Sequence, residues 1–317
     1  MTDLPAPASS ATTAAAPVCR VCRSARHRFL CATPNTHSQT TPLHHHRCLE
    51  CGSVFVADAI GPAELGVAYS TLDSTTYYAD IETETTDKMV SAIADLSALQ
   101  LHKQRLIDVG TGNGMFVPLL AKAGFSDISV HEIEGNDLSQ IAGQVRAMYQ
   151  DYDYATVPSD AFDVVTLLDV AEHVIEPLFL MKTSHRILRD GGTLYIHTPV
   201  VTRTDRAMHA LLKLPGLARI GRMWQAGRTS IFHLQNYTPR ALDDLLRQAG
   251  FDDVKIIVRN ELSWPVSRYI QAFVLQRLGL PFSLAPLLVP FFYPLLASKL
   301  FNANKAIVTA RKRPRPA

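Results

Sequence analysis

The sequence predicts an α/β protein built on a mostly parallel sheet, with a small module ahead of it. Two observations support this prediction. The apolar run Leu106–Val109 is followed by glycines at alternate positions and then by an amphipathic stretch, which is the order strand, glycine turn, helix of a nucleotide-binding βαβ unit. Two Cys-x-x-Cys pairs lie upstream of that unit.

The bulk properties are those of a soluble globular protein. The chain has 317 residues, of which 47% are apolar and 19% are charged, and its formal net charge is +2. This charge favours neither nucleic acid nor membrane as a partner. Residues 1–18 are rich in Ala, Thr, Pro and Ser and have no apolar core of signal-peptide length. We expect a disordered leader there and a cytoplasmic protein.

Four of the five cysteines form the two pairs, and Cys31 is left over. Paired cysteines in a reducing compartment are metal ligands more often than disulfides. Four thiolates would form a closed tetrahedral zinc site of the structural type, in a zinc-ribbon-like module at 19–58. The 25 residues between the pairs exceed the usual ribbon spacing, and the alternative is a module without metal. The expected ligands are Cys19, Cys22, Cys48 and Cys51.

Residues 59–84 are polar and are expected to form a linker. A helix with a cap at Thr86–Asp87 follows, because Met89, Ile93 and Leu96 recur at helical spacing. We expect this helix to cover the sheet just before the first strand.

The glycine turn separates two classes of nucleotide ligand. Dinucleotide-binding turns have a third glycine after a two-residue gap, where this chain has Met115. Asp108 ends the strand just before the turn, and a carboxylate there suits a cationic ligand better than a pyrophosphate. The alternative is that Asp108 only caps the turn. The next strand contains Glu132, at the spacing at which an acid binds a ribose diol; Glu134 is an alternative.

The later strands are expected at 162–168, 193–199 and 306–312, the last of them antiparallel. The loop from Asp169 to His173 follows the first of these, at the carboxyl end where α/β sheets place ligands. Between the first two, Pro177 should open a helix and the pair Gly191–Gly192 should end it.

Four motifs together resemble class I S-adenosylmethionine-dependent methyltransferases, in particular the group that includes the quinone-ring O-methyltransferases. The similarity spans residues 85–311. Cysteine pairs ahead of such a domain also resemble bacterial methyltransferases that act on sugars and secondary metabolites. The motifs are Asp108-Val-Gly-Thr-Gly-Asn-Gly, Asp169-Val-Ala-Glu-His-Val, Arg189-Asp-Gly-Gly-Thr-Leu and His233-Leu-Gln-Asn-Tyr-Thr-Pro.

The resemblance implies a Rossmann-like seven-stranded sheet in a domain at 85–317, with S-adenosylmethionine as cofactor. The short strand before Asp151 and Tyr152 would then hold the adenine. His131 departs from the group, which more often has a small residue there, and is expected to crowd the ribose. The cofactor-binding residues implied are Asp108, Gly110, Thr111, Gly112, Asn113, Gly114, Glu132, Asp151, Tyr152 and Asp169.

Methyl transfer to a hydroxyl or a carbon acid needs a general base near the methyl group, usually a histidine. His173 lies in the loop that this fold directs at the donor, and His233 could approach from the acceptor side. The alternative for His173 is that it only shapes the donor pocket. His197, within a strand, is expected to be a packed core residue.

Residues 202–228 form a basic insertion after the fifth strand. It contains six cations and only one acid, Asp205. If the insertion folds over the acceptor site as a lid, these cations would suit a phosphate-bearing acceptor. The alternative is a solvated basic surface. Aromatic residues do not interleave with these cations as in a nucleic-acid groove, so we expect no nucleic acid. The cations are Arg203, Arg206, Lys213, Arg219, Arg222 and Arg228.

Residues 278–298 form an uncharged segment as long as a membrane span. Prolines at 281, 286, 290 and 294 should prevent a regular helix. We therefore expect a homodimer face or an interfacial membrane hairpin, which would place the protein at the inner face of the membrane.

The sequence thus indicates a methyltransferase acting on a small molecule, most simply a hydroxyl of a sugar, glycolipid or quinone-like metabolite, phosphate-bearing or lipid-linked. The alternatives are a C- or N-methyltransferase acting on a nucleotide-linked sugar, and a non-catalytic zinc-stabilised binding protein. Met115 and Asp108 disfavour a nicotinamide enzyme.

Overall fold

The computed structural model describes residues 17–34, 42–61, 64–65, 87–133, 137–229, 232–262, 265–276 and 279–314. The expected leader lies outside these residues except for its last two positions. Most of the expected linker at 59–84 lies outside them as well, and so do Thr86 and Glu134.

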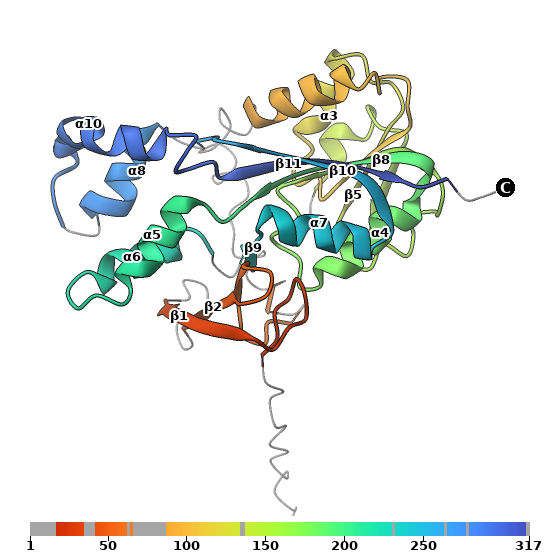
Figure 1. The fold of residues 1–317 in the computed structure, drawn as a ribbon. Helices are drawn as coiled ribbons and strands as arrows, with labels where there is room; N and C mark the ends of the chain where they lie inside the picture. Colours follow the sequence, from red (N-terminus) through yellow and green to blue (C-terminus); the bar gives the residue numbers. More distant parts are fainter. Residues whose placement is uncertain are drawn as a thin grey trace, which may run out of the picture.

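Seven strands form the main sheet, in the order β10-β11-β8-β7-β4-β5-β6 (Figure 1). Strands β4 to β8 pair in parallel, and β11 runs antiparallel between β8 and β10. The prediction of a mostly parallel sheet with an antiparallel last strand is therefore confirmed. The strands are β4 (Leu106–Val109), β5 (Ile128–Glu132), β6 (Ala147–Gln150), β7 (Phe162–Leu168), β8 (Leu188–Pro199), β10 (Phe251–Arg259) and β11 (Lys305–Lys312).

Helices cover both faces of this sheet, because successive strand residues point to opposite sides. Leu106 joins the core under α3 (Phe116–Lys122) and the helix at 87–98. Its neighbour Ile107 joins the core under α4 (Pro177–Ile187) and α7 (Pro239–Gln248). Figure 1 shows α3 on one side of the sheet and α4 and α7 on the other. A 3-10 turn, η1 (Ser139–Ile141), precedes β6.

Helix α4 ends earlier than expected. It stops at Ile187 because β8 begins at the next residue, and the pair Gly191–Gly192 lies inside that strand. Phe162 pairs with Leu188 whereas Val164 pairs with Thr193, so the intervening residues of β8 bulge out. Gly191 has a φ of +76°, a conformation that glycine adopts without strain. The glycine pair forms a bulge and not a helix end.

The Asp95 side chain fixes the helix at 87–98 to two strands of the main sheet, β8 and β10. Arg259 of β10 donates to both oxygens of this carboxylate, at 2.7 and 2.9 Å, and the Tyr195 hydroxyl of β8 donates at 2.9 Å. A bidentate guanidinium–carboxylate pair fixes relative orientation as well as distance. The helix that precedes β4 is thereby positioned against β8 and β10.

The N-terminal module is continuous with the main domain through a shared sheet. Its strands β1 (His27–Thr33), β2 (Leu43–Cys48) and β3 (Val54–Val56) pair antiparallel, and β9 (Gln235–Asn236) from the main domain adds to β3. The Thr238 hydroxyl also donates to the Cys51 carbonyl at 2.6 Å. The module therefore docks through backbone pairing and not through the linker alone.

The basic insertion folds as a helical hairpin, α5 (Arg203–Leu211) and α6 (Ala218–Ala226). Thr202 and Asp205 form a capping box at its start. The two helices touch closely at Gly221, where an added Cβ would lie 2.7 Å from the Met208 carbonyl oxygen. The hairpin leaves the carboxyl end of β8, and α6 packs against β1.

The apolar segment contains a regular helix, so the prediction that its prolines prevent one is wrong. The segment contains η3 (Phe282–Leu284) and α10 (Ala285–Leu296), and it follows α8 (Val266–Ile270) and η2 (Gln271–Leu275). Pro286 lies in the first turn of α10, where no N–H bond is needed. Pro290 and Pro294 are four residues apart, so both missing bonds fall on one stripe of the helix. No helix among the described residues is long and apolar enough to cross a membrane.

Candidate active site

The glycine turn after β4 is a tight cradle that side chains would fill. Gly110, Gly112 and Gly114 all have positive φ. A Cβ on Gly110 would lie 2.6 Å from Val170, and one on Gly114 would lie 2.7 Å from Ile141. Both positions require glycine for conformation and for space. The turn is therefore shaped for close approach of a ligand to its backbone.

Glu132 meets this turn from the end of β5. One carboxylate oxygen accepts the Gly112 N–H at 2.6 Å, and the other accepts the Ile133 N–H at 2.8 Å. The two residues that the sequence linked only by spacing are thus in direct contact. A ribose diol at this position would have both the carboxylate and the turn within hydrogen-bonding reach.

Asp108 lies beneath the turn. It is buried, and the Thr166 hydroxyl of β7 donates to its carboxylate at 2.6 Å. Burial raises the pKa of Asp108 to about 6, and the hydrogen bond from Thr166 opposes this rise. This contact joins Asp108 to β7, and both its binding of a cationic ligand and the alternative that it caps the turn stay predictions.

Asp151, which directly follows β6, is held in place by its neighbours. The His131 ring lies 3.3 Å from the Asp151 carboxylate and 3.1 Å from its carbonyl oxygen, and stacks on Tyr154 with ring centroids 4.3 Å apart. The Tyr152 side chain is exposed. The contacts of His131 are thus made to Asp151 and Tyr154, and its crowding of a ribose stays a prediction.

The Asp169 carboxylate is saturated by three partners from distant parts of the chain. Lys88 and Lys305 each approach it at 2.8 Å, and so does His197 Nδ1. Burial would raise the pKa of Asp169, but Lys305, Lys88 and His197 hold it well below its usual range. The other ring nitrogen of His197 contacts Glu261 at 2.7 Å.

His197 is therefore more than the packed core residue that was expected. Its ring is buried, and burial alone would lower its pKa, but Asp169 and Glu261 on its two sides raise it. The two carboxylates thus favour the protonated form of this ring, which lies between them at 2.8 and 2.7 Å.

A carboxylate and two imidazoles meet beside this ion cluster. Ligand atoms of Glu172, His173 and His233 all lie within 4.8 Å of one another, and the two rings pack edge to face with centroids 4.7 Å apart. Burial lowers the pKa of His173 to about 4, so the ring is neutral at pH 7. Burial and then the charge of Asp169 raise the pKa of Glu172 to about 7. The same donors would also fit a divalent cation.

The segment after His233 fixes the loop that contains His173. The Tyr237 hydroxyl donates to the Ala171 carbonyl at 2.5 Å, and the Gln235 side-chain amide donates to the carbonyls of Ala171 and Val174 at 2.8 and 2.9 Å. Both side chains are buried. The two motifs that lie far apart in sequence therefore form one wall of the site.

The four paired cysteines converge as expected. Their sulfur atoms lie within 4.8 Å of one another, with Cys19 and Cys51 at 3.7 Å and Cys22 and Cys48 at 3.5 Å. Tetrahedral zinc with Zn–S bonds of about 2.3 Å separates its sulfurs by about 3.8 Å, so the cluster fits zinc without rearrangement. Cys31 is buried in β1 and is not part of the cluster.

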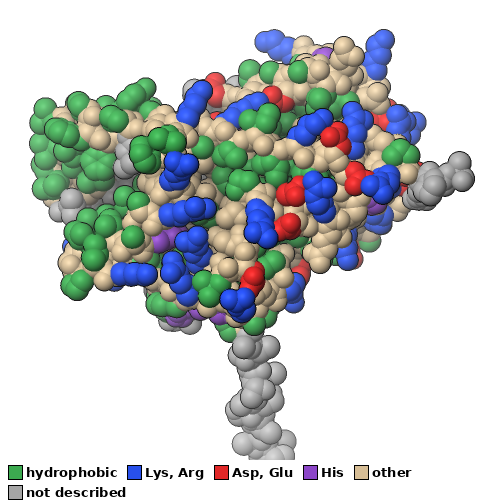
Figure 2. Space-filling model, in the orientation of Figure 1, with side chains coloured by type: hydrophobic (Ala, Val, Ile, Leu, Met, Phe, Trp, Pro, Cys, Tyr) green, Lys and Arg blue, Asp and Glu red, His purple; other side chains and the backbone are tan. Residues whose placement is uncertain are grey.

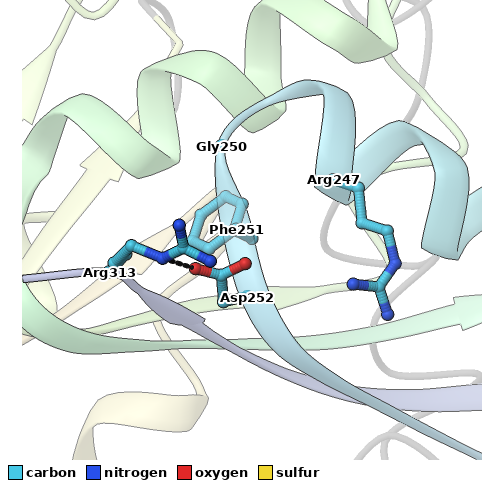
Figure 3. Close-up of a pocket in the computed structure, with 5 residues that line it drawn as sticks. All are labelled: Arg247, Gly250, Phe251, Asp252 and Arg313. Atoms are coloured by element: carbon cyan, nitrogen blue, oxygen red, sulfur yellow. Dashed lines mark ion pairs between the residues drawn. The ribbon is translucent and has the colours of Figure 1, made fainter.

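A surface pocket near the start of β10 lies away from these groups. It is lined by Arg247, Gly250, Phe251, Asp252 and Arg313 (Figure 3). Arg313 is ion-paired with Asp252, and Arg247 with Asp243. The pocket is at the amino end of β10, the edge opposite the glycine turn, and its charges are already paired, so it is not a candidate for the site.

Sequence reasoning missed five residues of the site. Four of them are separated by long stretches of chain from the loop they contact, and single residues of common types give no local signal. Tyr237 and Gln235 lay inside a recognised motif, but nothing in that motif shows which partner they contact. The missed residues are Lys88, Gln235, Tyr237, Glu261 and Lys305.

Residues 81–256, more than half of the chain, match the family described as "Methyltransferase domain". The chain belongs to this family. The strand order and the glycine turn agree with that membership.

Among curated relatives, the ubiquinone biosynthesis O-methyltransferase of Ruegeria pomeroyi is 31% identical over 168 residues, and that of Roseobacter denitrificans is 27% identical over 168 residues. Each alignment covers 50% of this chain and 65% of the relative. The chain thus spans just under two thirds of the length of these relatives.

Solved structures resemble this one more distantly. The 1,6-didemethyltoxoflavin-N1-methyltransferase of Burkholderia thailandensis aligns with a TM-score of 0.48 and 15% identity, covering 84% of this chain and 97% of that one. A SAM-dependent methyltransferase of Thermotoga maritima, a possible histamine N-methyltransferase, has a TM-score of 0.46 and 16% identity, covering 75% and 96%. The strand order of this chain, not these likenesses, defines its fold.

The ion cluster predicts that replacing Asp169 destabilises the protein far more than replacing an exposed carboxylate does. Asp169→Asn should lower the free energy of unfolding by about 3 kcal/mol, because it leaves buried cations without their counter-charge. Asp252→Asn, which removes an exposed pair with Arg313, should cost less than about 1 kcal/mol. Urea denaturation of both variants measures this, and equal losses would contradict a structural role for the cluster.

Proposed function

We propose that this protein transfers a methyl group from S-adenosylmethionine to an oxygen atom of a small-molecule acceptor. The observation that supports it most is the contact of the Glu132 carboxylate with the glycine turn at Gly112, 2.6 Å away. At this one place, a carboxylate can accept hydrogen bonds from a ribose diol and the glycine turn leaves room for the rest of a nucleoside. Membership of the methyltransferase family points to the same donor.

The residues present fit such a donor. Gly110 and Gly114 leave the space that Cβ atoms would occupy, Glu132 would accept bonds from the ribose hydroxyls, and Asp151 would lie beside the adenine. S-adenosylmethionine supplies an electrophilic methyl group on a sulfonium, which leaves as S-adenosylhomocysteine. The protein's main contribution is to hold the acceptor oxygen in line with that methyl group, which raises the effective concentration of the nucleophile.

The acceptor proton would pass to His173. This imidazole is neutral at pH 7 because burial lowers its pKa to about 4, and a neutral imidazole can act as a base. The Glu172 carboxylate, 3.9 Å from His173 Nε2, would stabilise the imidazolium that forms. His233 packs edge to face on His173 and would orient it. In this step the bond between the methyl carbon and the sulfonium sulfur breaks, a bond between that carbon and the acceptor oxygen forms, and the hydroxyl proton moves to a nitrogen of His173.

The class of methyl acceptor is proposed from the relatives and from the groups around the site. The relatives act, by their names, in ubiquinone biosynthesis, which favours a ring hydroxyl. The cysteine module and the exposed cations of the α5–α6 hairpin favour a sugar or glycolipid with a phosphate. Arg228 is not among those cations, since it binds Asp205 and the Val200 carbonyl. A C- or N-methyltransferase and a non-catalytic binding protein are the alternatives.

We further propose that Cys19, Cys22, Cys48 and Cys51 hold one structural zinc ion. The site is closed, with four thiolates and no open position for chemistry. Zinc would stabilise the module at 19–58 and, through β9, the segment next to His233 in the domain at 85–317.

Donor binding can be measured by calorimetry with S-adenosylhomocysteine. The parent protein should bind it and should not bind NAD. Gly112→Val should abolish binding, because the side chain would enter the cradle in a backbone conformation that valine rarely adopts. Gly143→Val is the matched control, since an added Cβ there meets no atom within 4 Å. Tight binding by Gly112→Val would show that the donor site is elsewhere.

The role of His173 can be read from kinetics. His173→Ala should lower the turnover number by roughly 10²-fold or more while affinity for S-adenosylhomocysteine stays unchanged, because loss of a general base has that size. If donor affinity falls instead, His173 shapes the pocket. A chelator provides a second test: turnover of the parent should survive EDTA at a concentration that leaves about one zinc per chain by elemental analysis. Loss of turnover while that zinc is retained would make the Glu172–His173–His233 cluster a metal site.

The metal is tested by elemental analysis of the purified chain, which should contain about one zinc per chain. Cys48→Ser should lose the zinc and lower the unfolding temperature, whereas Cys31→Ser should retain it. Full thermal stability of a zinc-free parent would rule out the structural role.

A further inference from the structure

Two helical hairpins project from one edge of the protein and expose large apolar side chains. The α5–α6 hairpin does so at its turn, and the α8–α10 segment does so along α10. Phe291 is 78% exposed and Leu287 is 68% exposed. Figure 2 shows a green surface at the left of the molecule, where Figure 1 shows α10 and the turn between α5 and α6. We call this surface the apolar tip; its exposed members include Leu217, Ile220, Leu287, Phe291, Leu300 and Phe301.

The two hairpins of the apolar tip are in contact with each other. Trp224 of α6 packs against the core of the α8–α10 segment, which contains Val266 and Ile270. The indole N–H of Trp224 donates to Asp205 at 2.6 Å, and Arg228 holds the same carboxylate. Asp205 therefore fixes Trp224 within the α5–α6 hairpin, and Trp224 makes the contact with the α8–α10 segment. The exposed apolar side chains of the two hairpins are held in place together.

Cations, and no carboxylates, accompany these apolar side chains. The sequence has no Asp or Glu from 206 to 242 and none from 262 to 317. Lys213 and Arg222 are exposed in the α5–α6 hairpin beside Leu217 and Ile220, and Lys299 is exposed next to Leu300. Figure 2 shows a column of Lys and Arg side chains bordering the apolar surface.

The neighbouring strands of the N-terminal module extend this basic border. Arg47 of β2 lies near two other cations: burial lowers its pKa most, and the charges of Arg206 of α5 and Arg28 of β1 lower it further. Cations held this near one another at a protein surface favour a dense array of anions in front of them.

We propose that the apolar tip and its basic border dock the protein on an anionic lipid bilayer, with the apolar side chains in the acyl boundary and the cations at the headgroups. Shallow burial of an apolar surface together with cations facing anionic lipids is the energetic basis of peripheral binding. The helices are too short to span, in keeping with a surface position. This inference does not depend on the reaction proposed above.

A second copy of the chain fits this surface less well. A two-fold dimer places the same patch of both chains face to face. The basic borders would then meet without an exposed carboxylate to pair them, because Asp205 is buried and bound to Arg228. An anionic membrane supplies the missing counter-charge. The orientation also has a consequence: both hairpins leave the carboxyl ends of β8 and β10, which is the sheet edge of the Asp169–His173 loop, so docking turns that edge toward the lipid.

Vesicle co-sedimentation of the full chain tests the proposal. The protein should bind vesicles of phosphatidylcholine mixed with phosphatidylglycerol and should bind pure phosphatidylcholine at least tenfold more weakly, with binding reduced by salt. Phe291→Glu should weaken binding roughly tenfold or more, because it places a charge in the acyl boundary. Lys213→Gln with Arg222→Gln should lower affinity for the anionic vesicles by about fivefold per cation.

Ile257→Glu is the matched control, since Ile257 is 57% exposed on β10 and lies outside the tip. It should bind vesicles like the parent. The proposal fails if the parent ignores anionic vesicles, if Phe291→Glu and Ile257→Glu bind equally, or if sedimentation velocity shows a dimer that Phe291→Glu dissociates. The circular dichroism of each variant should match the parent, because the substituted side chains face solvent.

Discussion

The position of the candidate site depends on the hydrogen bonds that hold the loop after β7. Tyr237 and Gln235 donate to the Ala171 carbonyl, and the Leu234 backbone N–H donates to the Glu172 carbonyl at 2.8 Å. Because Gln235 also belongs to the strand that extends the N-terminal sheet, the cysteine module, the loop and the core of the domain form one unit. A change in the module would thus affect His173 through the buried hydrogen bonds of Leu234, Gln235 and Tyr237.

Charge burial gives the second constraint. Asp169 gathers Lys88, Lys305 and His197, which come from the helix before β4, from the last strand and from β8. Such a cluster stabilises a fold only when every member is paired, and here each cation meets a carboxylate. It also sets the local field: Asp169 is the charge that helps keep Glu172 protonated at pH values below about 7. The fold and the chemistry proposed for the loop therefore share the same ions.

The sequence predicted the sheet, the glycine turn and the cysteine cluster because each has a local period or spacing. Glu132 was found from its distance to Asp108, and the contact with Gly112 agrees with that reasoning. Contacts set by the folded chain could not be predicted. Nothing local places Lys88 beside Asp169, or places the buried His197 between Asp169 and Glu261. The helix through Pro290 and Pro294 was missed because proline propensity was weighed without the stripe on which the lost bonds fall.

The central claim is that Glu132 and the glycine turn form the nucleoside site. A crystal structure of the protein with S-adenosylhomocysteine tests it most directly. The account predicts both ribose hydroxyls within hydrogen-bonding distance of the Glu132 carboxylate, with the bond from Gly112 to that carboxylate replaced or shared. A nucleoside bound away from β4 and β5, with the bond between Gly112 and Glu132 unchanged, would contradict it.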